Sequence, residues 1–274
     1  MTSLSRIRQF RRTVRAYYRK HKRAFPWRET ADPYHILVSE IMLQQTQVGR
    51  VCEKYPEFVA AFPEVASLAE APLSSVLRVW KGMGYNRRAL ALKSIAYIVC
   101  QKYGGVIPRD PEILRTLPGI GKGTAGSIPA FAYNIPTVFI ETNIRRVFIY
   151  HFFPHATQVR DETILKLVAE TLDRKNPRAW YSALMDYGSY LGSTLRGNNP
   201  NIKSKHYRKQ SAFEGSNRKI RGIIIALLSN GQKQSMHAVI RAAGNDSGRV
   251  RHNLSVLVKE GFLEKQRGGY RMKS

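Results

Sequence analysis

Hydrophobic residues recur with helical spacing along nearly the whole chain up to about residue 195, and strand signals are scarce before the C-terminus. In the first segment, Leu4, Ile7, Phe10 and Val14 share one side of a helix, and basic residues occupy the other. The pattern predicts a mainly α-helical protein. The predicted helices cover residues 4–22, 34–46, 48–62, 73–81, 87–103, 111–116, 122–133, 140–152, 161–173 and 177–191.

The helical spacing is lost over residues 192–215, where the chain is polar and basic. This stretch is either a solvated linker or a loop that faces DNA. From 217 to 274 the sequence predicts a small C-terminal winged helix-turn-helix domain, with three short helices followed by a hairpin. Its third helix presents Arg249 and Arg251, as a helix that reads a DNA groove would, although the same fold also serves as a packing or dimerisation module.

The charge of the chain is strongly unbalanced. In 274 residues, 45 Lys and Arg face 19 Asp and Glu, which gives a formal net charge of +26. The basic residues are spread along a sequence with 43% hydrophobic residues, enough for a core, rather than gathered in a tail. Such a surplus indicates a polyanionic partner, in most cases nucleic acid.

The two cysteines, Cys52 and Cys100, lie in apolar helical segments and are expected to be reduced thiols of a cytoplasmic protein. An iron–sulfur cluster is not expected, because such clusters are usually held by four thiolates. No other metal site is expected. No apolar run is long enough to span a bilayer and no signal peptide opens the chain, so we expect no membrane partner.

The glycine-rich segment 117–125 has the composition of a hairpin that binds phosphate. Pro118 fixes its entry, Gly119 and Gly121 are expected to take positive φ, and a helix should begin near Lys122. The N–H groups and the positive dipole end of that helix would then bind a phosphate without reading sequence. A plain helix–helix corner is the alternative, and a monovalent cation is compatible with the hairpin. The predicted DNA contacts are Gly119, Gly121, Lys122, Gly123 and Thr124.

Several motifs follow one another in a recognisable order: Pro26-Trp27-Arg28, Ser39–Val48, Gly82–Tyr85, Leu117–Gly126 and Asn143–Val147. Over roughly residues 24–192 they resemble the helix-hairpin-helix DNA glycosylases of the HhH-GPD superfamily, most closely the MutY-type adenine DNA glycosylases. The Leu-Gln-Gln-Thr-Gln-Val run is the most specific of these motifs.

The resemblance implies a two-lobed helical fold with DNA in the cleft. Residues 30–138 would form the lobe with the hairpin, residues 1–29 and 139–213 would form the other lobe, and the winged domain would follow at 217–274. In the family, the Glu that matches Glu40 protonates the purine. An Asp stabilises the positively charged sugar, and Glu141 stands at that position here.

The sequence departs from the family pattern in ways that bear on chemistry. Glu141 is one methylene longer than Asp, so its carboxylate must sit back or approach at another angle. The cluster cysteines are missing, and Gly192 stands where the first would be. Gly123 replaces the lyase Lys of relatives such as endonuclease III, and the domain that senses 8-oxoguanine is not recognisable. The residues expected to pack in place of the cluster are Tyr187, Tyr190, Tyr207 and Phe213.

The bond between a neutral purine and its sugar breaks slowly, because the departing anion is a poor leaving group. Protonation at N7 corrects this, and a Glu beside apolar residues has the raised pKa that such an acid needs. Taken alone, Glu40 and Glu141 could be surface carboxylates; within these motifs they are the candidate catalytic pair. Asn143 either orients the Glu141 carboxylate or caps the helix that follows.

The target base must leave the stacked duplex, and the gap must be filled. The candidates for this plug are Gln44, Gln45, Met83 and Tyr85. Tyr85 could instead belong to the core. Arg87 and Arg88 are expected to contact phosphates, with a solvated basic face as the alternative, and Arg145 is also expected to contact DNA. An arginine stays charged and forms no Schiff base, so AP-lyase activity is not expected.

The sequence therefore predicts a monofunctional DNA glycosylase of base excision repair that hydrolyses the N-glycosidic bond of a flipped adenine opposite guanine or 8-oxoguanine. The alternatives are a thymine or uracil glycosylase acting opposite guanine, and a DNA-binding protein without catalysis. The expected partner is double-stranded DNA with a mismatched or damaged base. We expect a cytoplasmic, nucleoid-associated monomer.

Overall fold

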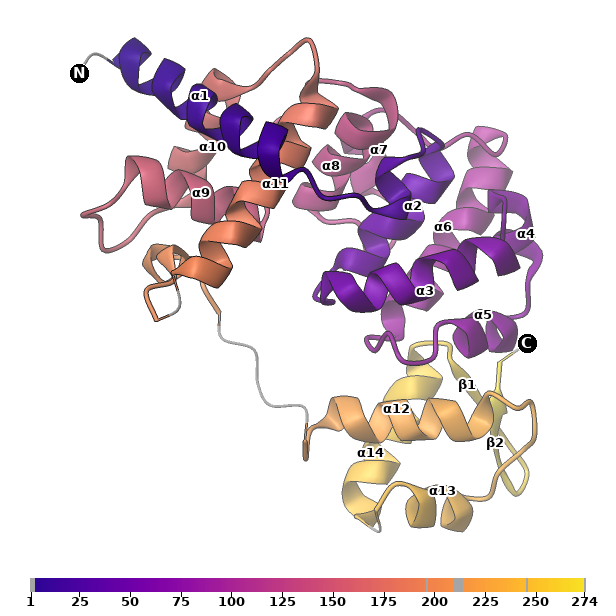
Figure 1. Ribbon diagram of the computed structural model, residues 1–274. Coiled ribbons are helices and arrows are strands. Elements are labelled where there is room, and N and C mark those ends of the chain that lie inside the picture. Colours follow the sequence, from indigo (N-terminus) through magenta and orange to yellow (C-terminus); the bar gives the residue numbers. More distant parts are fainter. Residues whose placement is uncertain (1–2, 196, 209–213, 245, 274) are drawn as a thin grey trace. The chain divides into compact units, whose positions relative to one another are not determined.

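The computed structural model describes residues 3–195, 197–208, 214–244 and 246–273. These residues are mainly α-helical, as predicted, and the strands among them form one antiparallel hairpin (Figure 1). The first elements are α1 (Ser3–His21), η1 (Pro26–Arg28), α2 (Pro33–Leu43), α3 (Val48–Ala61), α4 (Val65–Glu70), α5 (Leu73–Val79), α6 (Arg87–Tyr103) and α7 (Pro111–Arg115). Those that follow are α8 (Lys122–Tyr133), α9 (Thr142–Phe152), α10 (Asp161–Thr171), α11 (Pro177–Thr194), η2 (Pro200–Lys203), α12 (Asn217–Leu228), α13 (Met236–Ala242), α14 (Ser247–Lys259), β1 (Leu263–Gln266) and β2 (Gly269–Met272).

Each predicted helix has a counterpart, and the differences lie at the ends. The predicted helix 34–46 corresponds to α2, which ends at Leu43, because Gln45 takes a left-handed φ of 55. The sequence predicts no helix at α4. This element has six residues, which give too short a periodic signal, and its start depends on a capping box between Glu64 and Ser67.

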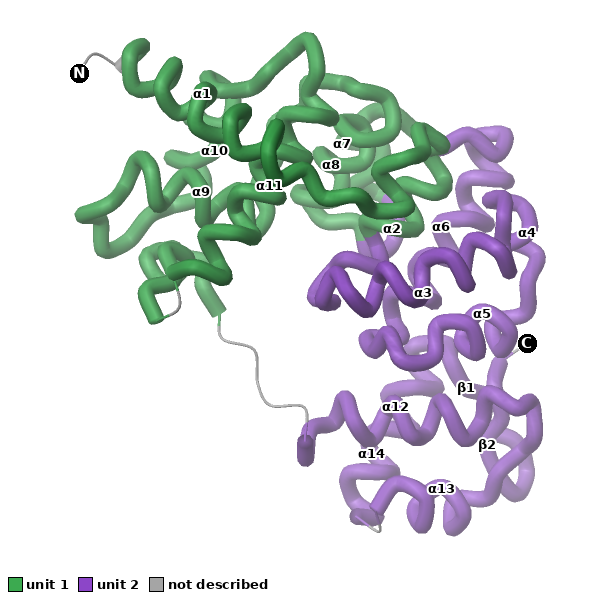
Figure 2. The backbone as a smooth tube through the Cα atoms, in the orientation of Figure 1, with its two compact units in different colours: residues 1–40, 108–116, 120–209 green, residues 41–107, 117–119, 210–274 purple. Residues whose placement is uncertain are grey.

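The chain divides into two compact units, shown in different colours in Figure 2. The first unit contains residues 1–40, 108–116 and 120–209, and the second contains residues 41–107, 117–119 and 210–274. The chain therefore passes from one unit to the other inside α2 and again in the glycine-rich hairpin. The C-terminal residues 217–274, which the sequence assigns to a domain of their own, fall in the second unit together with α3 to α6.

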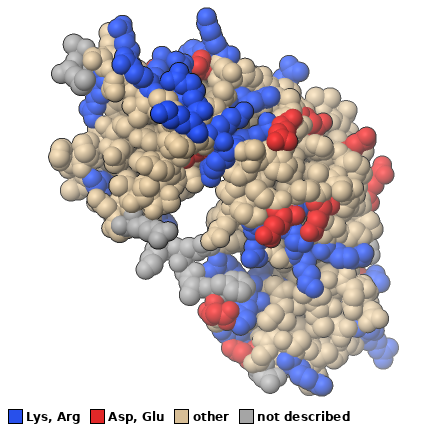
Figure 3. Space-filling view, viewed as in Figure 1, with Lys and Arg blue, Asp and Glu red and all other residues tan. Residues whose placement is uncertain are grey.

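The core of the first unit joins α1, α9, α10 and α11. Phe10 and Val14 of α1 are buried in the same cluster as Phe148 of α9 and Trp180 of α11, and the ring centroids of Phe10 and Phe148 lie 5.1 Å apart. The apolar face of α1 thus packs as its spacing predicts. Lys and Arg side chains gather over α1 on the face shown in Figure 3, so the polar face of this helix carries a basic surface.

Tyrosines fasten α11 to α1. The rings of Tyr187 and Tyr190 lie 5.2 and 5.0 Å from that of Tyr17. The prediction that these tyrosines pack where a cluster would sit stays a prediction. Tyr207 is 39% exposed, and Phe213 lies outside the described residues.

The segment after α11 is pinned to the first unit by polar contacts. Nε of Arg146 in α9 lies 3.5 Å from the side-chain oxygen of Asn199, and Nδ2 of Asn201 donates to the carbonyl of Thr142 at 3.1 Å. Asn201 and Ser204 are buried. The alternative of a merely solvated linker is therefore wrong for this part of the segment.

The C-terminal residues follow the predicted order of elements, with α12, α13 and α14 before the β1–β2 hairpin. Leu254 of α14 and Phe262 are fully buried. Asp246 caps α14 by accepting from a backbone N–H of its first turn at 3.0 Å. In the hairpin, Leu263 pairs with Met272.

Candidate active site and nucleic-acid interface

Glu40 lies in the last turn of α2 and is partly buried. Its carboxylate accepts a hydrogen bond from the hydroxyl of Ser127, a buried residue of α8. Burial raises the pKa of Glu40 to about 7. The Ser127 hydrogen bond opposes this rise, the negative charge of Glu141 adds to it, and the charge of Arg28 opposes it. An acid with this pKa is about half protonated at pH 7, and that fraction can donate a proton.

Glu141 is the N-cap of α9, and its carboxylate folds back onto the first turn of its own helix. Oε1 accepts from the backbone N–H groups of Asn143 at 2.7 Å and Ile144 at 2.8 Å. Burial raises the pKa of Glu141, whereas these N–H groups and the charges of Arg145 and Arg146 act to lower it. The carboxylate of this longer side chain is thus directed at groups that favour an anion.

Asn143 connects the Glu141 carboxylate to Arg146. Its Nδ2 lies 3.4 Å from Oε2 of Glu141, and its Oδ1 accepts from Nη1 of Arg146 at 2.7 Å. Of the two roles considered for Asn143, this geometry supports orientation of the carboxylate, because the helix cap is Glu141 itself.

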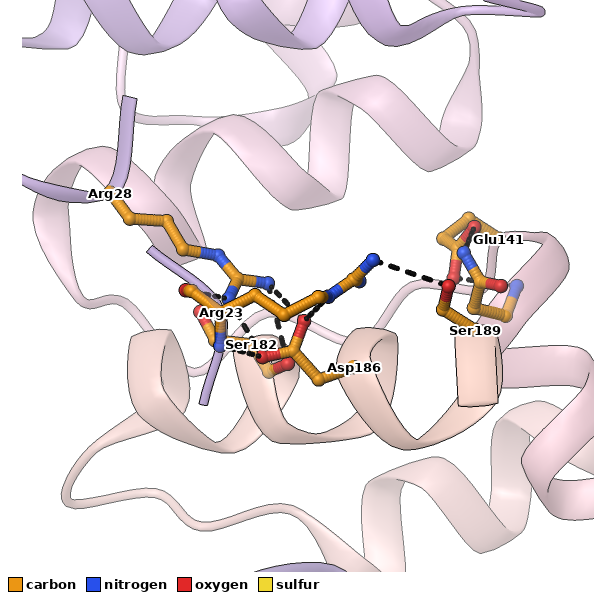
Figure 4. A network of polar contacts seen from close by, with 7 residues as sticks. Arg23, Arg28, Glu141, Ser182, Asp186 and Ser189 are labelled. Atoms are coloured by element: carbon orange, nitrogen blue, oxygen red, sulfur yellow. Dashed lines mark hydrogen bonds and ion pairs between the residues drawn. The ribbon is translucent and has the colours of Figure 1, made fainter. Parts of the chain in front are cut away.

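A buried carboxylate of α11 is the centre of a network of arginines. Asp186 of α11 is 1% exposed and binds two guanidinium groups, with Nε of Arg23 at 2.7 Å and Nη1 of Arg28 at 2.8 Å (Figure 4). Arg23 also donates to Ser189 of the same helix at 3.2 Å. The Arg28 charge also acts to lower the pKa of Glu40, so this network influences the candidate acid.

Two glycines let α11 approach α9 where the candidate residues lie. A Cβ at Gly188 would lie 2.5 Å from the carbonyl oxygen of Asn143, and a Cβ at Gly192 would lie 2.7 Å from Nη1 of Arg146. A side chain at Gly188 would therefore displace the backbone that holds Glu141. At Gly192, where the resemblance places a cluster cysteine, the Arg146 guanidinium occupies the adjoining space.

The glycine-rich hairpin differs from its prediction in one angle. Gly119 has φ +75, and a Cβ there would lie 2.9 Å from that of Ala91. Gly121 does not use the positive φ that glycine permits, because it is the extended N-cap of α8 with φ −89. Because glycine has no side chain, no side chain caps the start of α8. Lys122, the first residue of this helix, is exposed. Both features suit a phosphate site at the helix N-terminus.

Gly123 and Thr124 complete the first turn of α8, and both are partly buried. A Cβ at Gly123 would lie 3.2 Å from the carbonyl oxygen of Ile140. Ile140 directly precedes Glu141 in the chain. The position that carries the lyase Lys in bifunctional relatives therefore adjoins the backbone that leads to the second carboxylate.

Arg88 of α6 holds the turn after α2 from inside the second unit. The side chain is 8% exposed, and it donates to the carbonyls of Met42 at 2.8 Å and Met83 at 3.1 Å, and to that of Gln44. Burial lowers the pKa of Arg88 to about 10. These contacts argue against the predicted phosphate contact, because the guanidinium is committed to backbone carbonyls.

The predicted plug residues fall into two groups. Met83 is 4% exposed, which argues against its use as a plug. Gln44 donates Nε2 to the carbonyl of Gly119 at 3.3 Å. Gln45 is exposed and Tyr85 is partly buried, and both have left-handed backbones with φ of 55 and 47. Gln44, which is also partly buried, Gln45 and Tyr85 are therefore the accessible candidates.

Two predicted DNA contacts are engaged within their own unit. Arg145 makes paired hydrogen bonds with Asp161 at 2.9 and 2.7 Å and is 18% exposed, which argues against a contact to phosphate. Arg249 donates to the carbonyl of Gly215 at 2.7 Å but remains 43% exposed.

Other predicted contacts present their cations to solvent. Arg87 is 69% exposed although it pairs with Glu260 of the C-terminal residues. Arg251 on α14 and Lys122 on α8 are exposed as well. These side chains can reach a DNA backbone without breaking a buried contact.

The residues present do not fit an iron–sulfur cluster. The chain has two cysteines, Cys52 in α3 and Cys100 in α6, and both belong to the second unit. The family's cluster follows the helix matched by α11, where this chain has Gly192 beside Arg146. Within the described residues, no group of three His, Cys, Asp or Glu side chains is placed to hold a metal ion.

Among the residues that the structure describes, none of the helices is both long and apolar enough to cross a membrane.

Comparison with known proteins agrees with the family resemblance of the sequence. Residues 38–170 match the HhH-GPD superfamily of base excision DNA repair proteins. The chain is 30% identical over 270 residues to the adenine DNA glycosylase of Mycolicibacterium smegmatis, with 93% of this chain and 92% of that protein covered. It is 35% identical over 179 residues to the adenine DNA glycosylase of Buchnera aphidicola, with 64% of this chain and 50% of that protein covered. The chain thus spans about half the length of the Buchnera relative.

Two solved structures are also similar. A thermostable thymine-DNA glycosylase superposes with a TM-score of 0.61 at 28% identity, covering 68% of this chain and 88% of that one. Endonuclease III in a non-covalent complex with DNA superposes with a TM-score of 0.58 at 18% identity, covering 69% and 87%, which shows a shared fold.

Proposed function

Because this chain belongs to the HhH-GPD superfamily of base excision DNA repair proteins, we propose that it is a DNA glycosylase that hydrolyses the N-glycosidic bond of adenine mispaired with guanine or 8-oxoguanine. The observation that carries the proposal is the state of Glu40, whose pKa of about 7 suits a general acid at neutral pH. The relatives named adenine DNA glycosylase support the choice of adenine.

In the proposed reaction, Glu40 donates its proton to N7 of the flipped adenine. The base then departs as a neutral molecule when the bond between C1′ and N9 breaks, and its electron pair stays on the base. Ser127 holds the carboxyl group in place during the transfer. A well-placed general acid contributes roughly 10²–10⁴-fold to such a step.

Glu141 then stabilises the positive charge that develops on the deoxyribose. Its anion is supported by N–H groups at the start of α9 and by Arg146, and Asn143 keeps the carboxylate oriented. Water adds to the C1′ cation and releases a proton, which leaves free adenine and an abasic sugar.

We propose that the reaction stops at the abasic site. A lyase needs an amine nucleophile, whereas position 123 is a glycine and Arg145 is held by Asp161. Strand cleavage at the abasic site without added base or heat, if it persists in Lys122→Ala, would contradict this proposal.

Double-stranded DNA with a mismatched or damaged base is the proposed partner, bound by a nucleoid-associated monomer. The net charge of +26 and the basic surface over α1 support it. Contacts to phosphate release counterions, so neutralising about 6–10 phosphates would make affinity fall roughly 10³–10⁵-fold between about 50 and 200 mM salt. A flat response to salt would exclude binding dominated by the DNA backbone.

The test is base release from every mismatched duplex and every 8-oxoguanine pair, with Glu40→Gln as the control. We expect free adenine from A:G or A:8-oxoguanine with the wild type and none with the variant, which should still bind the duplex. Failure to release any base, or full turnover by Glu40→Gln, would favour the alternative of a DNA-binding protein without catalysis.

A second candidate is a thymine glycosylase acting opposite guanine, and the similarity to a solved thymine-DNA glycosylase favours it. The same panel of duplexes decides between the two, because this candidate releases thymine from T:G and spares A:G. Adenine is preferred here, because the relative that matches 93% of this chain is named adenine DNA glycosylase.

A further inference from the structure

The loop before α6 is fastened to the C-terminal residues within the second unit. Arg218 of α12 donates Nη1 to the hydroxyl of Tyr85 at 2.5 Å, and its guanidinium carbon lies 5.4 Å from the centre of the Tyr85 ring. The guanidinium of Arg88 also lies 5.4 Å from this ring. Tyr85 is thus held by one cation that backbone carbonyls fix and by another that the C-terminal residues supply.

A second contact joins the start of α6 to the same residues. Glu260, the C-cap of α14, pairs with Arg221 of α12 and with Arg87. Glu260 and Arg221 are each 17% exposed, so this end of the contact is largely withdrawn from water. Although burial acts to raise the pKa of Glu260, the two arginines hold it below its usual range.

Both contacts act on a backbone that needs support. The φ of Tyr85 is 47, a left-handed conformation that a bulky aromatic residue rarely adopts and that its surroundings must maintain. Met83 anchors the loop in the core, and Arg88 binds its carbonyls from within. The hydrogen bond from Arg218 restrains the outer end of the Tyr85 side chain.

We infer that Arg218 and Glu260 are positioning residues, through which the C-terminal residues set how Tyr85 and Arg87 meet DNA and how well a mismatched pair is distinguished from a matched one. The inference rests on the base flipping that the proposed function requires, with Tyr85 as the candidate side chain that fills the space left by the flipped base. A guanidinium on the phenol oxygen fixes the angle of the ring. Without this hydrogen bond the Tyr85 ring can rotate. The stacking of the ring on DNA then depends less on which base pair lies beside it.

The test measures binding in the full chain with Glu40→Gln present, so that turnover does not interfere. Fluorescence anisotropy gives the Kd for an A:G duplex and for an A:T duplex at one salt concentration. Arg218→Ala is compared with Arg241→Ala, which removes the same charge from an exposed position of α13. We expect Arg218→Ala to lower the ratio of the two affinities about tenfold, as for a lost hydrogen bond of a charged group. Arg241→Ala should leave the ratio unchanged.

Further variants separate positioning from a general loss of structure. Arg218→Lys can still donate to the hydroxyl and should restore much of the ratio. Arg218→Ala should add nothing to Tyr85→Ala, because the two side chains act together. Glu260→Gln should lower the ratio of the two affinities by less than Arg218→Ala does. Its control is Glu264→Gln, which removes a charge that pairs with Arg271 within the β1–β2 hairpin.

An unchanged ratio in Arg218→Ala would overturn the inference, as would equal affinity of the parent protein for both duplexes. Tighter binding of Arg218→Ala to both duplexes would also overturn it, because the C-terminal residues would then obstruct DNA. A wild type that prefers the mismatch but releases no base would instead overturn the proposed function and leave the inference standing.

Discussion

The two candidate catalytic carboxylates are the same side chain in the same unit, yet they stand at opposite ends of helices. Glu40 lies in the last turn of α2, where it accepts from the Ser127 hydroxyl. Glu141 lies at the start of α9, where it accepts from two backbone N–H groups and faces Arg145 and Arg146. A helix C-terminus disfavours an anion and a helix N-terminus favours one. Burial raises the pKa of both carboxyl groups, but the partners differ, because only Glu141 has backbone N–H groups and two arginines that favour its anion.

The largest expected effect comes from Glu40→Gln, which keeps the shape of the side chain and removes the proton. Single-turnover base release should fall by at least about 10²–10⁴-fold, with DNA affinity unchanged. Glu57→Gln is the matched control, because Glu57 is a 55% exposed residue of α3. Comparable rates for the two variants would remove Glu40 from the role of acid.

Glu141→Gln tests the other half of the comparison. The amide cannot stabilise a cation, so base release should fall by roughly 10²–10³-fold. Glu141→Asp keeps the anion and should lose less. If Glu141→Gln weakened DNA binding without slowing single-turnover release, the carboxylate would serve binding rather than chemistry.

The stability of the protein should reveal the proton on Glu40. Its pKa rises from 4.5 to about 7 on folding, so between these pH values the folded protein holds a proton that the unfolded chain has released. The free energy of unfolding contributed by Glu40 therefore falls as pH rises through this range. Relative to the wild type, Glu40→Gln should gain on the order of 1–3 kcal/mol in unfolding free energy between pH 4 and pH 8.

Urea unfolding at several pH values measures this difference, and Glu57→Gln should show none of it. A gap between Glu40→Gln and the wild type that stays constant with pH would mean that the Glu40 proton is lost well below neutral pH.

The smallest expected effect is a shift in the pH profile of Ser127→Ala. The Ser127 hydrogen bond lowers the pKa of Glu40, so its removal should raise that pKa further. Base release, which declines as pH rises and Glu40 loses its proton, should then decline at a higher pH than in the wild type. A shift toward lower pH would show that Ser127 supports the protonated form instead.

Local patterns in the sequence predict much of this molecule. The spacing of apolar residues predicts the helices, and the tight turn predicts the positive φ of Gly119. The motif around Glu40 predicts its role, because the chemistry of that motif requires an acid. Ser127 lies 87 positions from Glu40, and it occupies a helix in which a serine carries no functional signal. Asp186 has partners 158 and 163 positions away, so its role depends on packing. The one available signal was its place among the apolar residues of α11, because a buried carboxylate requires cations.

Arg88 shows why charge alone misleads. A basic residue at the start of a helix predicts a surface contact, and Arg87 next to it is indeed exposed. Arg88 points the other way, because carbonyls at the end of α2 and in the loop at Met83 and Gly84 need a donor. The sequence cannot show such acceptors, since they belong to the backbone.

The narrow space at Gly123 has a consequence for how this catalyst can change. A side chain there would press on the carbonyl of Ile140, which must yield by a few tenths of an ångström. Glu141 follows Ile140, so the anion would move with it. A lysine at position 123 and a correctly placed Glu141 carboxylate therefore compete for the same space beside the Ile140 carbonyl. A shift from hydrolysis to strand scission would need compensating changes in α9 as well as the new lysine.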